Sequence, residues 1–198
     1  MTLWQRKKQR TRAEIVAAAY ELFAERGYPE VTVADIVERA EVGRSTFFRY
    51  FGDKQEVVFD GEQEFLDEVH ARYEPMPVRR APDLATALEL MRGLVLSICA
   101  GAVSDPDLYR VRERLISENP DLADRGSRKL GRIVDLATAI LRGMGADERT
   151  AVLAPWLARA CFQAGRELAG NDPDALAPAV GDAFDSLLRQ VRAPEGTQ

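Results

Sequence analysis

The residues best suited to chemistry with a partner lie in the stretch RSTFFRY, residues 44–50. On a helical wheel of about 100° per residue, Phe47 and Phe51 share one side and can pack inward. The outward side holds Ser45, Thr46, Phe48 and Arg49. A merely solvated helix would carry Glu and Lys pairs, but this stretch has no carboxylate. Guanidinium groups pair with guanine, hydroxyls with phosphates or bases, and a ring with a thymine methyl or a sugar, so the stretch predicts a helix that reads the major groove of DNA.

Two short helices across a tight turn would position this face. Thr32 and Asp35 have the spacing of a helix start, in which a hydroxyl and a carboxylate satisfy backbone amides. Gly43 is placed to cap the second helix. The pattern predicts a helix-turn-helix over residues 32–51.

Lys54 follows in the first turn of the next helix, which Asp53 and Glu56 begin. The helix dipole disfavours a cation there by a few tenths of a kcal/mol, and a nearby phosphate would reverse that preference. The alternative is an exposed lysine that the helix tolerates at small cost.

The distribution of charge supports a DNA partner although the net charge is −5. Residues 1–54 carry a net charge of +2 and the remainder −7, and residues 1–12 contain five basic residues and no acid. A basic arm on an acidic body is expected when one end meets phosphate. A disordered solubilising tail is the alternative.

The helical periodicity predicts an all-α fold of about nine helices. A capping box at Thr11–Glu14 starts a helix that Gly27 ends, so a basic arm and three helices form a DNA-binding domain over residues 1–54. Residues 55–198 form a larger helical domain for ligand binding and dimerisation. We expect a linking helix over residues 53–73, a proline-rich connection over residues 74–82 and a loose tail from residue 193.

The last two helices carry stripes in which small and large side chains alternate, which allows another helix to approach closely. These stripes either close a four-helix interface across a two-fold axis or are consumed in the core of a single chain. The predicted dimer residues are Leu157, Ala160, Ala164, Leu168, Phe184, Leu187, Leu188 and Val191.

An enzyme has little support in the sequence. We find no phosphate loop, no zinc spacing and no metal or cofactor motif, and the single histidine, His70, has no Cys or second His near it. Cys99 and Cys161 lie in apolar helical patterns and are expected to be buried, reduced thiols. No run of about 18 apolar residues and no secretory leader is present, so we expect a cytoplasmic protein without a membrane partner.

The order of features resembles the TetR family of bacterial transcription regulators. A basic arm precedes ELFAERGY and then TVADIVERAEVGRSTFFRYFGDK, and the resemblance covers roughly residues 10–60. The FFRYF form is similar to a group of actinobacterial members. Two departures are Gly43, where the family often has a serine cap, and Phe48, which replaces a common tyrosine.

The resemblance implies a homodimeric repressor that binds a palindromic operator and is released by a small apolar or amphipathic inducer. By matching position, the groove-facing residues would be Arg44, Ser45, Phe48 and Arg49. The phosphate contacts would be Thr32, Thr46, Tyr50 and Lys54. The alternative function is a helical protein-interaction module that docks through the helix-turn-helix.

The inducer pocket is expected among the middle helices. Its predicted lining is Leu88, Met91, Val95, Leu115, Ile133, Val134, Ala137, Trp156 and Phe162. For each of these residues, plain core packing is the open alternative.

Overall fold

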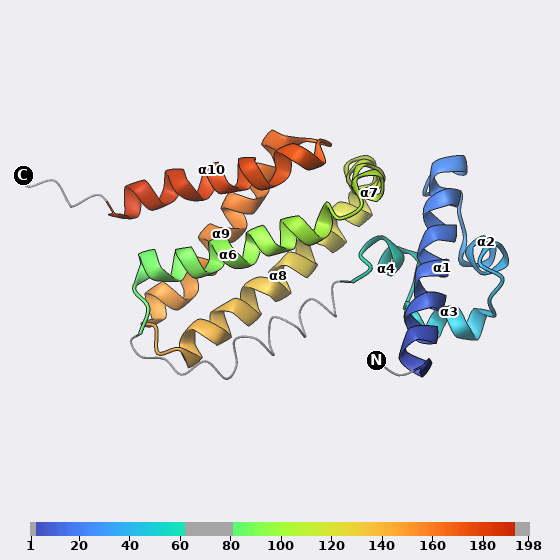
Figure 1. The fold of residues 1–198 in the computed structure, drawn as a ribbon, viewed down its shortest axis with the longest axis horizontal. Coiled ribbons are helices and arrows are strands. Elements are labelled where there is room, and N and C mark those ends of the chain that lie inside the picture. Colours follow the sequence, from blue (N-terminus) through green and yellow to red (C-terminus); the bar gives the residue numbers. More distant parts are fainter. Residues whose placement is uncertain (1–2, 62–80, 193–198) are drawn as a thin grey trace, which may run out of the picture. The chain divides into compact units, whose positions relative to one another are not determined.

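The computed structural model of the 198-residue chain describes residues 3–61 and 81–192. These residues form nine α-helices and no strand, which confirms the predicted all-α class over the described part of the chain. The chain divides into two compact units, Met1–Gln63 and Glu64–Gln198. The helices, labelled as in Figure 1, are α1 (Leu3–Arg26), α2 (Val33–Arg39), α3 (Arg44–Tyr50), α4 (Lys54–Val58), α6 (Leu84–Ala102), α7 (Pro106–Glu118), α8 (Pro120–Gly143), α9 (Glu148–Ala169) and α10 (Pro173–Arg192).

The basic N-terminal residues belong to α1 and do not form a separate arm before it. The helix begins at Leu3, eight residues before the predicted start at Thr11. Residues 3–12 contain Arg, Lys and Gln, which favour a helix, and neither Gly nor Pro. An ion pair one turn apart, from Arg10 Nε to Glu14 Oε1 at 2.8 Å, adds support. The basic residues therefore lie on the outside of the first turns of α1.

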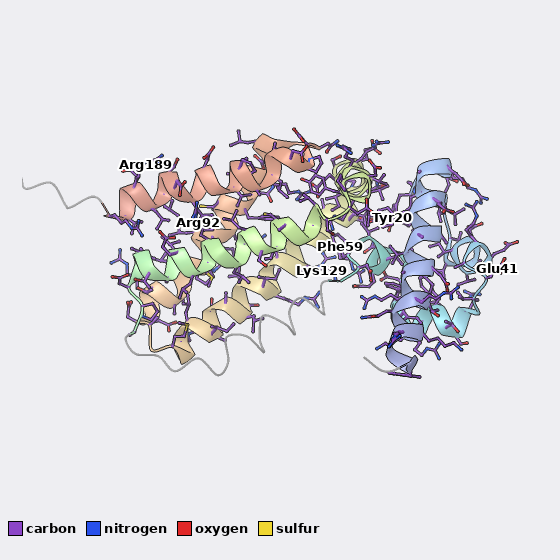
Figure 2. All side chains as sticks on the ribbon, viewed as in Figure 1. Tyr20, Glu41, Phe59, Arg92, Lys129 and Arg189 are labelled. Carbon is purple, nitrogen blue, oxygen red and sulfur yellow. The ribbon has the colours of Figure 1, made fainter. Side chains whose placement is uncertain are left out.

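The core of the N-terminal unit is small, and its side chains are almost completely buried. The side chains at its centre are at most 3% exposed and come from α1, α2 and α3 with the residue that caps α3: Ile15, Ala19, Leu22, Phe23, Ile36, Phe47 and Phe51. Helix α4 joins this core through Val57 and Val58. The buried hydroxyl of Tyr20, labelled in Figure 2, donates to the carbonyl of Val58 at 3.2 Å and ties α4 to α1.

Helix α4 is much shorter than the predicted linking helix of residues 53–73. It ends at Val58, and Gly61 follows in a turn at a φ of 87°, a conformation that glycine adopts without strain. Residues 62–80 and 193–198 lie outside the described residues. They include residues 62–73 of the predicted linking helix, His70, most of the predicted connection and the predicted tail.

The C-terminal unit packs its long helices around α9. Helix α9 contacts α6, α8 and α10, and α6 also contacts α10. Figure 1 shows α9 passing behind α6 between the α8 and α10 sides of this unit. Three of its helices begin at an aspartate whose side chain accepts a backbone N–H three residues later: Asp83, Asp105 and Asp147, with distances of 2.8, 3.0 and 3.0 Å. Cys99 and Cys161 are buried free thiols, as predicted.

The tightest helix contact in this unit involves Gly165. A Cβ atom placed on Gly165 would lie 2.5–2.6 Å from Cγ2, Cα and N of Val180 in α10. Only a residue without a side chain allows the two backbones this close. At this point the predicted small-residue stripe is used within a single chain.

By length and composition, α6 is the one helix of the described residues that could cross a membrane. Its two charged residues are paired with α10, since Arg92 lies 3.2 Å from Asp185 and Glu89 lies 2.7 Å from Arg192. Figure 2 shows Arg92 between the two helices. The opposite face, with Ala87 and Met91, belongs to the hydrophobic core. Helix α6 is therefore a bundle helix of the C-terminal unit.

Candidate functional site

The capping box predicted at the start of α2 is present in full. Thr32 Oγ1 accepts the backbone N–H of Asp35 at 3.2 Å, and Asp35 Oδ2 accepts the backbone N–H of Thr32 at 2.8 Å. The hydrogen bond from the Thr32 hydroxyl, and then the one from its backbone N–H, lower the pKa of the Asp35 carboxyl, because they favour its charged form. The hydroxyl of Thr32 also donates to this carboxylate at 2.5 Å. Thr32 is exposed, but its hydroxyl is engaged in the cap.

The turn between α2 and α3 has a conformation that fixes the start of α3. Glu41, labelled in Figure 2, lies in the left-handed region at a φ of 51°. Gly43 is the N-cap of α3 and makes no side-chain hydrogen bond. The first turn of α3 consequently keeps backbone N–H groups that no side-chain cap satisfies.

Helix α3 presents the two faces that the sequence predicts. Phe47 is fully buried and Phe51 is 3% exposed, with ring centroids 5.7 Å apart. Phe48 is 51% exposed and meets the edge of Phe47 at 5.4 Å. The other exposed side chains of the helix are Arg44, Ser45 and Arg49, while Thr46 and Tyr50 are half-buried. The exposed face holds two guanidinium groups and no carboxylate.

Arg49 is positioned by a ring on its own helix. Its guanidinium lies 5.3 Å from the centroid of Tyr50. A cation held against an aromatic face in this way loses part of its rotamer freedom before any partner arrives. The stacking therefore favours an outstretched Arg49 on the exposed side of α3.

A charged brace that the sequence analysis missed holds α2 against α1. Arg39 donates to Glu25 at 2.8 and 3.0 Å and to Glu21 at 3.3 Å. The hydrogen bond lowers the pKa of Glu25 and raises that of Arg39. The only sequence signal was the spacing of two glutamates four residues apart on α1, which places them on one side of the helix.

Lys54 has a role that the sequence did not predict. Its Nζ donates to the carbonyls of Tyr28, Pro29 and Val31 at 2.9, 3.3 and 2.8 Å and lies 4.3 Å from the ring centroid of Tyr28. An ammonium has three N–H donors, so this set occupies all of them. Partial burial lowers the pKa of Lys54. In this conformation Lys54 clamps the loop before α2 and is not a freely exposed lysine.

The C-terminal unit contains an apolar pocket between α6, α8 and α9. Its volume is about 50 Å³. Six of the nine predicted lining residues are present: Met91, Val95, Ile133, Val134, Ala137 and Phe162. The sequence analysis missed Leu94, Ile98, Leu130, Pro155, Ala158 and Arg159.

Three predicted pocket residues lie elsewhere. Leu88 is fully buried in the helix core and does not line this pocket. Leu115 is a buried residue of α7 outside the lining, and Trp156 is 52% exposed on α9. Periodicity identifies an apolar face but does not determine which turn of that face borders a cavity.

Arg159 is the one charged residue in the lining of this pocket. One guanidinium nitrogen, Nη2, donates to the hydroxyl of Ser127 at 2.8 Å, and the group lies 5.4 Å from the ring centroid of Trp156. Among the described residues, no carboxylate pairs with it. A signal was available in the sequence, because Arg159 lies one turn from Phe162 and Pro155 on the same side of α9.

The predicted dimer residues divide into two groups. Phe184 and Leu188 are 0% and 4% exposed, because they pack in the core of the chain itself. The rest remain accessible, with Leu168 79% exposed. Accessible apolar stripes run along α9 at Leu157, Ala160, Ala164 and Leu168, and along α10 at Ala179, Ala183, Leu187 and Val191.

A buried cluster of polar side chains, Tyr109, Glu113 and Arg166, lies apart from these sites. Arg166 Nε donates to Glu113 Oε2 at 2.5 Å, and the Tyr109 hydroxyl has no hydrogen-bond partner among the described residues. Burial, and then the charge of Glu113, raise the pKa of Tyr109 to about 12. The described residues contain no cluster of His, Cys, Asp or Glu that could hold a metal.

A helix-turn-helix unit with an exposed basic reading face, joined in one chain to a larger helical unit, defines a helix-turn-helix transcription regulator. Residues 15–60 match the model of the bacterial regulatory proteins of the tetR family. The chain is 31% identical over 210 residues to the HTH-type transcriptional regulator TcmR of Streptomyces glaucescens, with 96% of this chain and 88% of that protein covered. The chain belongs to the TetR family.

Two solved structures share the fold. A TetR-family transcriptional regulator from Syntrophomonas wolfei superposes with a TM-score of 0.60 at 17% identity, covering 96% of this chain and 99% of that one. The TetR-family repressor FadR of Thermus thermophilus, solved in complex with lauroyl-CoA, gives a TM-score of 0.55 at 25% identity, covering 94% and 98%. These comparisons confirm the predicted class of transcriptional regulator.

Proposed function

We propose that this chain is a homodimeric repressor that binds a palindromic operator and is released by a small apolar or amphipathic molecule. The observation that carries the proposal is the exposed face of α3, which has two arginines and no carboxylate. On this proposal the N-terminal residues 1–54 bind DNA, and residues 55–198 bind the ligand and dimerise. The FFRYF sequence assigns the chain to an actinobacterial type of reader, and the protein acts in the cytoplasm.

The groove-facing residues in this proposal are Arg44, Ser45, Phe48 and Arg49. Arg44 and Arg49 pair with guanine, and Phe48 contacts a thymine methyl or a sugar. Thr46 and Tyr50, at the border of the buried face, contact the phosphates. The cap hydroxyl of Thr32 and the ammonium of Lys54 stay proposed phosphate contacts, although both groups already hold the frame of α2 together.

The dimer in this proposal is closed by the accessible stripes of α9 and α10, which two copies would pair as a four-helix interface. Two readers on a two-fold axis must meet successive major-groove faces about 34 Å apart. A ligand that binds better to a dimer with another spacing lowers DNA affinity by its differential binding to the two states.

The alternative function is a protein-interaction module that uses the helix-turn-helix as a docking surface. The exposed Phe48 ring is the observation that favours it, because aromatic side chains are enriched at protein interfaces. The lack of a carboxylate on the same face favours DNA.

A fluorescence-anisotropy titration against DNA from upstream of the chain's own gene separates the two functions. We expect the double variant Arg44→Ala, Arg49→Ala to lose at least about 30-fold in affinity, since each guanine pair contributes about 1–3 kcal/mol. The variant Arg149→Ala, which removes an exposed arginine of α9, is the matched control and should bind normally. Full affinity in the double variant, or binding without sequence preference, would contradict a DNA-reading role.

A further inference from the structure

The pocket of the C-terminal unit combines an apolar interior with a single charged residue, Arg159, whose guanidinium forms an exposed hydrogen bond to Ser127 at the rim. Every lining residue from α6 and α8 is apolar, and from α9 only Arg159 carries a charge. A pocket of this kind holds the body of a ligand by apolar contact and orients it through its few polar groups. The chemistry of Arg159 therefore decides which class of ligand is preferred.

The guanidinium of Arg159 has unused capacity for an anion. It has five N–H donors, and its hydrogen bond in the described structure is the one to Ser127. No carboxylate of the described residues neutralises it. The Trp156 ring, 5.4 Å away, restricts its orientation without removing its charge. An anionic group at this position would form charge-assisted hydrogen bonds, and a carboxylate matches the fork of a guanidinium.

We infer that the ligand proposed above is an amphipathic carboxylate, with its apolar body between α6, α8 and α9 and its carboxylate on Arg159. This inference rests on the proposed function in one respect, that the ligand controls DNA binding. The binding itself is a property of the C-terminal unit.

The pocket must widen to accept such a ligand. Its volume of about 50 Å³ is far below the roughly 300–1,000 Å³ of pockets that bury a drug-sized ligand. Met91, in the lining, has three rotatable bonds and adapts readily to a new neighbour. The described conformation is thus the closed member of a pair of states, and the carboxylate favours the open one.

The test uses the full chain with Trp4→Phe, so that Trp156 is the only tryptophan. Its emission, with calorimetry as a second readout, measures the binding of decanoate, decanol and decyltrimethylammonium without DNA. We expect decanoate to bind about tenfold or more tightly than decanol, because a hydrogen bond to a charged group contributes about 1.5–3 kcal/mol. The cationic analogue should bind more weakly than decanol.

Variants of Arg159 test whether this side chain causes the preference for decanoate over decanol. Arg159→Gln should remove the advantage of decanoate over decanol while leaving decanol binding within about twofold. Arg149→Gln, an exposed arginine of the same helix, is the control and should change neither. Arg159→Lys keeps the charge and should retain part of the preference for decanoate. It replaces the glutamine variant in the test if that variant does not fold.

Equal affinity for decanoate and decanol, no decanoate binding up to millimolar concentration, or a preference that survives Arg159→Gln would overturn the inference. Lauroyl-CoA is a further arm: tight binding of lauroyl-CoA without any binding of decanoate would also overturn it, because the anion recognised would then be a phosphate. Operator binding by the ligand-free protein is measured separately. A failure there refutes the DNA-binding function and leaves the ligand result standing.

Discussion

The contact between α9 and α10 at Gly165 gives a prediction in which the same substitution has opposite effects at two positions. Gly165 and Gly131 both lie inside long helices, where alanine is favoured over glycine by about 1 kcal/mol. At Gly131 an added Cβ meets nothing within 4 Å. We expect Gly131→Ala to raise the free energy of unfolding by about 0.5–1 kcal/mol.

At Gly165 the same methyl group would lie 2.5–2.6 Å from three atoms of Val180, two of them in the backbone. Carbon atoms in contact prefer about 3.5–4.0 Å, so α9 and α10 must move apart by about 1 Å. Overpacking of a well-packed core costs typically about 1–3 kcal/mol and occasionally more, and a backbone cannot change rotamer to relieve it. After the gain in helix propensity, we expect a net loss of about 2 kcal/mol, and a melting temperature lower by about 4–8 °C for a chain of this size.

Urea and thermal unfolding of the two variants beside the unsubstituted protein measure the difference. In a Trp4→Phe background for all three proteins, emission from Trp156 in α9 follows the C-terminal unit directly. Equal stabilisation by both substitutions would refute the close contact of α9 and α10 within one chain. It would then favour the reading in which the small-residue stripe serves a partner.

Further outcomes follow from the described contacts and from the proposed dimer. Lys54→Gln should lower the free energy of unfolding by about 2 kcal/mol because it removes the clamp on the loop before α2, and it should reduce the slope of log K against log salt by about 0.9 because it removes a proposed phosphate contact; an unchanged slope would contradict that contact. Tyr109→Phe should be neutral or stabilising by about 1 kcal/mol because it removes an unpaired buried hydroxyl, whereas Tyr20→Phe should cost about 1 kcal/mol. The pKa of Tyr109 is raised from 10.0 to about 12, so burial favours its neutral form; the free energy of unfolding that this preference contributes should be complete below pH 10 and lost as the pH rises toward 12. A pH series of thermal melts should show this loss in the unsubstituted protein and not in the phenylalanine variant. Leu168→Glu should weaken dimerisation by about a hundredfold or more in sedimentation, since each copy loses about 1.5 kcal/mol or more of apolar burial, whereas Arg149→Glu should not.

The sequence predicted best where a local rule decides the conformation. The capping box at Thr32 and the inward pair Phe47 and Phe51 both depend on residues a few positions apart. The same local rules misplaced the start of α1. The spacing at Thr11 matches a cap, but residues 3–12 already favour a helix, so α1 continues through the matched position.

Contacts between distant residues could not be predicted, because they depend on how helices meet. The amino-acid sequence by itself determined the all-α class, the helix-turn-helix and its carboxylate-free face, since periods of 3.6 residues and end caps are set within a few turns. Only the tertiary structure decided that Lys54 clamps the loop before α2, that Phe184 faces the core of its own chain and that Arg159 reaches the pocket. The physical reason is that the local pattern of a helix is the same whichever neighbour its apolar or charged residues contact. The packing of the helices alone determines which neighbour each residue meets.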